Sequence, residues 1–177
     1  MKLIVDNRWR VDASHVVDLP MSASAVWGQM RDLRRFITID PLHQRVRVEQ
    51  CTAARAIPRQ GDALVIEHRL LGIGVDRISR VLRWREGRGY AVSDLSKRGV
   101  HVGFPHVCVY DVQPTGERTA RLTIAARGRW TATFLPRALV KLWLWWIMRS
   151  TAARIEAELL SLALLARRRR VATPPPP

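Results

Sequence analysis

The feature that most constrains the fold is a long central region in which apolar and polar residues alternate. Between Arg45 and Trp130, six segments show a period of two, which is typical of half-buried β-strands. They are RVRVEQC, ALVIEHRLLG, VDRISRVLRWR, GYAVSDLSK, HVCVYDVQ and TARLTIAARGRW. Short turns such as PRQGD, EGRG and PTGER separate them, and short turns join antiparallel neighbours. The sequence therefore predicts an antiparallel meander.

Different patterns flank this region. HVVDLP indicates a strand, and the residues after Ser22 have the spacing of an amphipathic helix. Pro136 suits the first position of a second helix, which the pattern extends over 137–168. We predict the α+β class, with one domain at residues 1–168 and a flexible basic and proline-rich tail at 169–177.

This order of elements resembles the helix-grip fold of the START-like, Bet v 1-like (SRPBCC) superfamily, particularly its bacterial polyketide cyclase/dehydrase and lipid-transport branch. The resemblance covers residues 13–166. It rests on VVDLPMSASAVWGQMRDLRRFITIDP, on the Gly61 and Asp62 pair, and on the last helix led by Pro136. These motifs imply a curved antiparallel sheet around the long C-terminal helix, with an internal cavity for a hydrophobic ligand. They mark the fold and carry no specific chemistry.

Strand pairing around EGRG brings polar side chains onto the apolar face. The register that sets Trp84 opposite Tyr90 also sets Arg80 opposite Asp94. His68, on the preceding strand, continues the same face. Because an isolated buried charge is costly, we expect Arg80 and Asp94 to form a cross-strand pair. Two interpretations of this pair remain open: a structural ion pair, and an anchor for the polar end of a ligand.

The strand FPHVCVYDV has two alternative registers. A five-residue loop at PTGER turns His106 and Tyr110 inward, with Tyr110 opposite Leu122. A four-residue loop turns Val107 and Val109 inward instead. We favour the first register, which adds an imidazole and a phenol to the cavity.

The C-terminal helix contains three tryptophans within LWLWWIM. Helical spacing predicts a sheet-facing stripe that includes Trp143 and Trp146 as pocket lining. The other members of this predicted stripe are Leu139, Leu142, Ser150, Ala153, Ala157, Leu160 and Leu164.

Several apolar residues of the helix fall outside this stripe. Leu144, Trp145 and Met148 point elsewhere, beside Lys141 and Arg149. An apolar tip flanked by cations suits a contact with an anionic membrane surface. The alternative is that another segment or a second subunit covers these residues, so both a monomer and a homodimer remain open.

Several classes of protein are disfavoured. The uncharged run between Lys141 and Arg149 is far shorter than the roughly 20 residues of a membrane-spanning helix. The N-terminal MKLIVDNRWR lacks the apolar region of a secretory signal, so we expect a cytoplasmic protein, with peripheral membrane association as a further expectation. Cys51 and Cys108 show neither metal-ligand spacing nor a disulfide pattern, and we interpret them as buried thiols.

The formal net charge of +15 raises the question of nucleic-acid binding. Basic residues are scattered over every segment, including arginines such as Arg77 on the expected wet face of the sheet. The densest run, ARRRR, adjoins the terminal tail. A basic adaptor for nucleic acid or anionic membrane is therefore the third hypothesis.

The first hypothesis is that the protein binds a hydrophobic small molecule or lipid in the cavity, with transport of that ligand as an extension of the same hypothesis. The alternative is a polyketide cyclase or dehydratase whose acid–base groups come from His68, His106, Tyr110, Arg80 and Asp94. The sequence contains no established catalytic, cofactor or metal-binding motif. We therefore assign no catalytic residue and expect neither cofactor nor metal.

Overall fold

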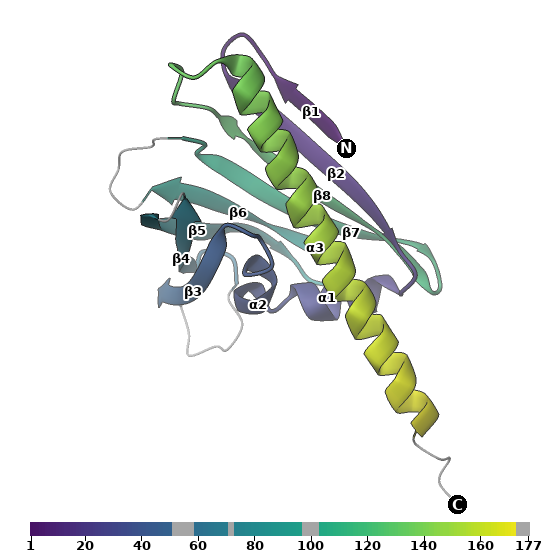
Figure 1. Cartoon of the computed structure of the whole chain (residues 1–177). Coiled ribbons are helices and arrows are strands. Elements are labelled where there is room, and N and C mark those ends of the chain that lie inside the picture. Colours follow the sequence, from purple (N-terminus) through teal and green to yellow (C-terminus); the bar gives the residue numbers. More distant parts are fainter. Residues whose placement is uncertain (51–58, 71–72, 97–102, 173–177) are drawn as a thin grey trace, which may run out of the picture.

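The computed structural model describes residues 1–50, 59–70, 73–96 and 103–172. Eight antiparallel strands form one sheet in the order β1-β2-β8-β7-β6-β5-β4-β3 (Figure 1). The strands are β1 (Lys2–Val5), β2 (Arg10–Leu19), β3 (His43–Gln50), β4 (Ala63–Leu70), β5 (Ile73–Arg85), β6 (Gly89–Ser96), β7 (His106–Gly116) and β8 (Thr119–Arg129). The helices are α1 (Ala23–Met30), α2 (Leu33–Ile37) and α3 (Arg137–Ala172).

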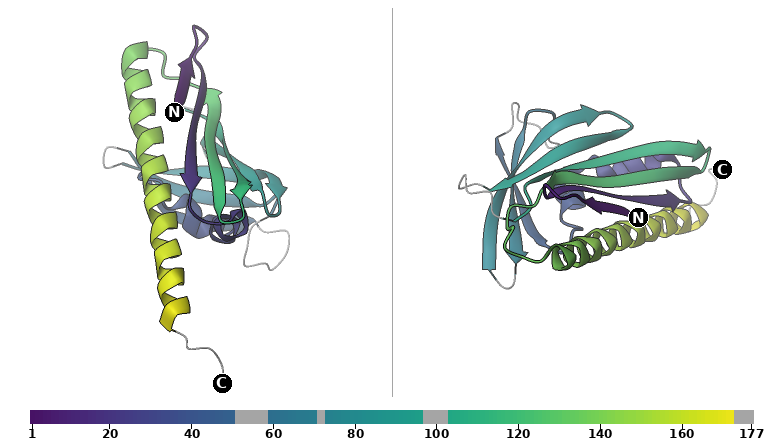
Figure 2. Two further views of the ribbon diagram at one scale, coloured as in Figure 1. Left: turned by 90° about the vertical axis from the view of Figure 1, so that its right-hand side faces the viewer. Right: turned by 90° about the horizontal axis from the view of Figure 1, so that it is seen from above.

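The sheet is strongly curved, and α3 lies along its concave side next to β1 and β2 (Figure 2). The chain passes from β2 through α1 and α2 to the far edge strand β3, and the meander then returns strand by strand to β8, which pairs with β2. The α+β architecture of a curved antiparallel sheet around a long C-terminal helix is thus confirmed.

The N-terminal region differs from expectation in two ways. The four-residue strand β1, which the sequence analysis did not predict, pairs with β2. The single expected helix is divided into α1 and α2, because Asp32 caps a second helix by accepting a hydrogen bond from the backbone N–H of Arg35. Ser22 caps α1 in the same way, by accepting a hydrogen bond from the backbone N–H of Ala25.

The pairing of β5 with β6 explains why one predicted ion pair is wrong. Trp84 does pair with Tyr90, but the register shifts between Val81 and Arg83, where a β-bulge accommodates one extra residue. An odd shift moves every residue beyond it to the other face of the sheet. Arg80 is therefore exposed and does not pair with Asp94.

The same bulge moves Arg77 from the expected wet face to the interior. Arg77 is only 8% exposed, and its Cα partner on β6 is Ser96. Asp94 lies two residues further along the same face of β6, so the side chains of Arg77 and Asp94 meet diagonally.

On β7, the predicted face is confirmed and the register is wrong by two residues. Tyr110 lies opposite Ile124 instead of Leu122, while Val112 takes the position opposite Leu122. Because side chains alternate with a period of two, an even shift leaves Tyr110 and His106 on the inner face.

The helix α3 presents to the sheet the face opposite to the one predicted. Its buried residues are Val140, Leu144, Met148, Thr151, Ala152, Ile155 and Leu159. The residues expected to face the sheet include Leu139, Leu142, Trp146 and Leu164, which are exposed. Both stripes are apolar at helical spacing, so periodicity alone could not decide between them.

The helix also continues to Ala172, past residue 168, where the domain was expected to end. Residues 173–177 of the expected tail lie outside the described residues, as does Cys51. Among the residues that the structure describes, no helix has the length and apolarity needed to span a bilayer.

Candidate ligand-binding cavity

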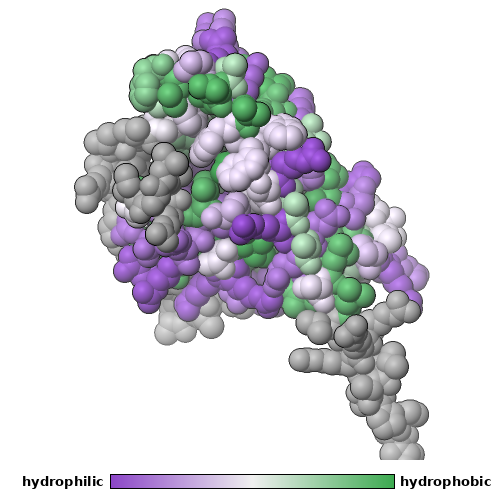
Figure 3. Space-filling model, viewed as in Figure 1, coloured by the Kyte–Doolittle hydropathy of each residue, from purple (hydrophilic) through white to green (hydrophobic). Residues whose placement is uncertain are grey.

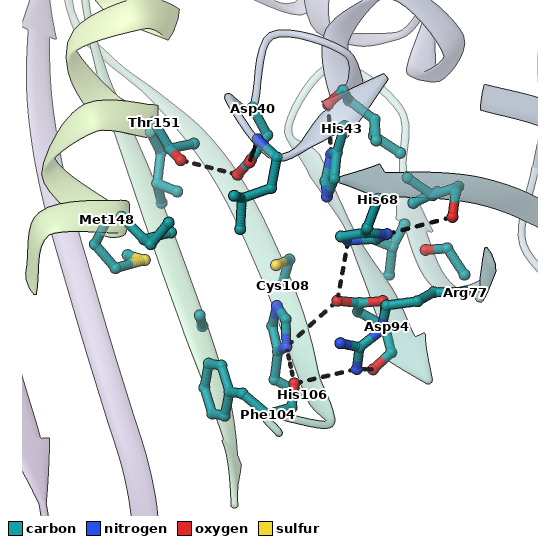
Figure 4. A pocket seen from close by; sticks show the side chains of 18 of the residues that line it. Asp40, His43, His68, Arg77, Asp94, Phe104, His106, Cys108, Met148 and Thr151 are labelled. Carbon is teal, nitrogen blue, oxygen red and sulfur yellow. Dashed lines mark hydrogen bonds and ion pairs between the residues drawn. The ribbon is translucent and has the colours of Figure 1, made fainter. Parts of the chain in front are cut away.

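A cavity of about 100 Å³ lies between the concave face of the sheet and α3. Figure 4 shows its polar residues on β4, β5, β6 and β7 and on the segment after α2, with α3 along the opposite side. Apolar lining includes Ile66, Ile124, Trp143, Ile147 and Met148. The cavity therefore has a polar wall on the sheet, a second polar contact between Asp40 and Thr151, and otherwise apolar surroundings.

The centre of the polar wall is the ion pair between Arg77 and Asp94. Arg77 Nε lies 2.7 Å from Asp94 Oδ1, and Asp94 is only 7% exposed. The Arg77 Nη2 group also donates to the backbone oxygens of Asp94 and Phe104, at 3.2 and 3.3 Å. These additional hydrogen bonds compensate the guanidinium for the water it loses on burial.

Three histidines surround this pair, and each uses its Nδ1 atom in the same way. A carbonyl oxygen can only accept a hydrogen bond, so each Nδ1 atom carries the proton that it donates to a backbone carbonyl. The contacts are His43 to Ile37 at 2.7 Å, His68 to Ile66 at 3.3 Å, and His106 to Phe104 at 2.6 Å. In a neutral imidazole with this tautomer, the Nε2 atom is a hydrogen-bond acceptor.

Burial keeps two of these imidazoles neutral near pH 7. Burial, assisted by the nearby His43 and opposed by Asp94, lowers the pKa of His68 to about 4. Burial also lowers the pKa of His106. His68 Nε2 and Asp94 Oδ2 lie 3.6 Å apart, so two hydrogen-bond acceptors face each other at the polar wall.

Two other lining side chains, Tyr110 and Cys108, carry no charge. Burial raises the pKa of the Tyr110 phenol and of the Cys108 thiol, so both keep their protons at neutral pH. The charges of Arg77 and Asp94 cancel, so the ion pair at the centre of the polar wall has no net charge. A protonated Cys108 is also a poor nucleophile, since the thiolate is the reactive form.

No model of a known protein family matches the sequence, and no curated protein matches it either. Solved structures do match. A START superfamily protein from Mycobacterium smegmatis superposes with a TM-score of 0.66 at 14% identity, over 85% of this chain and 98% of that one. The protein has the helix-grip fold of START-like and Bet v 1-like proteins.

Two further helix-grip structures are described as enzymes. The Zhui aromatase/cyclase from a Streptomyces species has a TM-score of 0.65 at 15% identity, over 93% of this chain and 97% of that one. A norcoclaurine synthase mutant from Thalictrum flavum, in complex with a transition-state analogue, has a TM-score of 0.59 at 10% identity, over 92% and 99%. Identities this low establish the common fold alone.

Within this helix-grip domain, five residues of the predicted ligand-binding set line the cavity. They are His68, Asp94, His106, Tyr110 and Trp143. Arg80 and Trp146 are exposed instead, because of the bulge in β5 and the orientation of α3. Trp84 packs against Trp27 outside the cavity, and both indole N–H groups donate to Glu86.

The predicted membrane-contact set is also divided. Leu144 and Met148 are buried and line the cavity, contrary to expectation, because they lie on the stripe that faces the sheet. Lys141, Trp145 and Arg149 are exposed, as expected.

Sequence reasoning missed several lining residues. Arg77 was assigned to the wrong face, and His43 was not considered because it precedes the first predicted strand of the meander. Asp40 and Thr151 were also missed. The Thr151 hydroxyl donates to Asp40 Oδ2 at 2.8 Å, which connects α3 to the segment between α2 and β3. Among the described residues, no cluster of His, Cys, Asp or Glu has the geometry to hold a metal ion.

Proposed function

We propose that the protein binds an uncharged hydrophobic molecule that carries a hydroxyl or another hydrogen-bond donor. The observation that supports this most strongly is the pair of acceptors at the polar wall, His68 Nε2 and Asp94 Oδ2, 3.6 Å apart. A ligand hydroxyl beside them could donate its one proton to either acceptor. His106, with its Nδ1 proton committed to Phe104, adds a third acceptor at Nε2.

The neutral ion pair at the polar wall argues against an acidic ligand. The guanidinium of Arg77 already contacts Asp94 and two backbone carbonyls. A carboxylate or phosphate in the cavity would add an unpaired charge beside Asp94, which is unfavourable in a buried site. The anchoring role foreseen for Arg80 therefore does not pass to Arg77, and Asp94 and the histidines become the anchors.

The dimensions of the cavity favour a compact ligand. An engineered apolar cavity of about 150 Å³ binds benzene, and the present cavity measures about 100 Å³. A single aromatic ring would fit after small movements of side chains such as Met148. A lipid chain or a multi-ring polyketide would require α3 or the segment around Asp40 to move.

The second candidate is a cyclase or dehydratase, as the named activity of the Zhui structure suggests. His68 and His106 would have to act as general bases. An efficient general base has a pKa near the working pH, whereas the pKa of His68 is lowered to about 4 and that of His106 is also lowered. Such imidazoles are weak bases that accept hydrogen bonds well enough, so the geometry supports binding better than catalysis.

Calorimetric titration with two matched probes tests this proposal. Phenol and its methyl ether anisole have the same ring, but only phenol can donate a hydrogen bond. We expect phenol to bind at least about tenfold more tightly, because anisole leaves the acceptors unsatisfied. Equal affinities for the two probes, or tighter binding of benzoate, would contradict the proposal.

Two variants link the effect to the polar wall. His106→Phe removes one acceptor and keeps an aromatic ring, so the preference for phenol over anisole should shrink. Arg80→Met, at an exposed position of the same sheet, should leave the preference unchanged.

A further inference from the structure

We propose that the first half of α3 is a docking surface for an anionic lipid bilayer. Its centre, called here the docking stripe, consists of Leu139, Leu142 and Trp146, which are 56%, 62% and 52% exposed. At about 100° per residue, spacings of three and four place these side chains on one face of the helix. Three large apolar side chains thus lie next to one another and are open to solvent.

The docking stripe exists because α3 is apolar on two faces. The sheet covers the face that contains Val140 and Leu144, and the docking stripe lies on nearly the opposite side of the helix. Folding of the domain therefore does not use these residues. Within the described part of the chain, no segment shields them from solvent.

The apolar surface extends to the end of the molecule where α3 begins. Phe134, in the turn before the helix, is 83% exposed, and Leu135 beside it is also exposed. Figure 3 shows hydrophobic residues gathered at this end of the molecule. An exposed apolar tip next to an apolar helix face suits shallow insertion between lipid headgroups.

The charges around this surface are of one sign. Residues 131–155 contain Arg137, Lys141, Arg149 and Arg154 and no acidic residue. The guanidinium of Arg149 lies 5.2 Å from the ring centre of Trp145, at the edge of the docking stripe. Indole rings and long basic side chains both suit the headgroup level of a bilayer, where anionic lipids supply the opposite charge.

A second copy of the chain is a less suitable partner. Pairing the docking stripe with itself would bring Arg149 of both copies close to one contact, with no acidic residue among residues 131–155 to oppose them. Helix pairs of this kind normally use complementary charges at their edges. The net charge of +15 on each copy adds to the repulsion.

Docking in this way would place the cavity close to the bilayer. Trp143 and Met148, on the same turns of α3 as the docking stripe, line the cavity. A hydrophobic ligand dissolved in the membrane would then be close to the wall of its binding site. The docking itself does not depend on which ligand the cavity takes.

Co-sedimentation of the full chain with lipid vesicles tests the proposal. We expect binding to phosphatidylcholine vesicles that contain phosphatidylserine, much weaker binding to pure phosphatidylcholine, and weakening by added salt. The double variant Leu142→Ser with Trp146→Ser should bind about tenfold more weakly or worse, because exposed apolar area drives insertion. Each of Lys141→Gln and Arg149→Gln should weaken binding about fivefold.

Matched controls distinguish this site from general stickiness. Val16→Ser removes an exposed apolar residue from the outer face of β2, and Arg83→Gln with Arg85→Gln removes two exposed cations from β5. The Val16 variant should bind vesicles like the parent. Replacement of Arg83 and Arg85 should weaken vesicle binding less than replacement of Lys141 and Arg149. Absence of vesicle binding by the parent would overturn the proposal, as would unchanged binding of the Leu142 and Trp146 variant. If sedimentation equilibrium showed that the parent is a dimer and that the Leu142 and Trp146 variant is a monomer, the docking stripe would instead be a contact with a second copy of the chain.

Discussion

Arg77 on β5 and Asp94 on β6 form a buried ion pair. The pair depends on a β-bulge in β5, located between Arg77 and the β5–β6 turn, which shifts the register of the two strands. The bulge sends Arg80 and Leu82 outward and brings Arg77 inward. One extra residue in β5 thereby decides which arginine reaches the cavity.

The first prediction concerns the stability of this pair. Asp94→Ala leaves the Arg77 guanidinium buried without its partner, so the free energy of unfolding should fall by about 3 to 5 kcal/mol. Arg80→Met, at an exposed position, should change it by less than about 0.5 kcal/mol. Urea denaturation measures both, and a larger loss for the Arg80 variant would show that the register without the bulge is correct.

The second prediction concerns pH. The folded-state pKa of His68 is lowered from 6.5 to about 4, so between these values the unfolded chain binds a proton that the folded protein does not. The free energy of unfolding should therefore fall as the pH decreases from 6.5 to about 4. His106, whose pKa is also lowered, acts in the same direction.

Replacement of His68 isolates its share of this effect. His68→Asn removes the titrating group, so the decline in stability over the same pH range should become shallower than in the parent. Identical slopes in urea denaturation series would mean that His68 is solvated or already protonated in the folded state.

The third prediction concerns the orientation of α3. Leu144 is buried against the sheet, and Leu144→Ala should cost about 2 to 5 kcal/mol. Trp146 is half exposed, so Trp146→Ser should leave the melting temperature nearly unchanged. Thermal melting of the two variants distinguishes the observed orientation from the opposite one, for which the effects would be exchanged.

The fourth prediction concerns access to the cavity. Thr151→Val removes the hydrogen bond from α3 to Asp40, a carboxylate next to the cavity. We expect a loss of about 1.5 to 3 kcal/mol in stability, as is usual for a hydrogen bond to a charged group. Phenol should also associate and dissociate faster, as line shapes in NMR titrations would show. Unchanged exchange rates would mean that ligands enter elsewhere.

The order of elements could be predicted because alternation and turns are local properties of the sequence. Four of the five lining residues that were predicted correctly lie on strands whose faces were correct, even where the register of β7 was wrong by two. The fifth, Trp143, lies on α3 and lines the cavity although the predicted face of that helix was wrong. By contrast, Arg77, Ser79 and Val81 alternate in the same way as Ile78, Arg80 and Leu82. Only the position of the bulge decides between these sets, and this depends on packing across the sheet.

The orientation of α3 could not be predicted for a related reason. A helix with one apolar stripe has one way to pack, whereas α3 has two such stripes, and the sheet can cover only one of them. The short strand β1 gave too few residues for an alternating pattern to be recognised.

A crystal structure of the complex with phenol would test the proposed binding mode at atomic detail. We expect the phenol ring to lie between the sheet and α3, in contact with apolar residues such as Trp143. Its hydroxyl oxygen should lie within hydrogen-bonding distance of one of the acceptors, namely Asp94 Oδ2 or the Nε2 atom of His68 or His106. A phenol molecule bound outside the cavity, or one inside it whose hydroxyl points away from Asp94 and both histidines, would contradict the account.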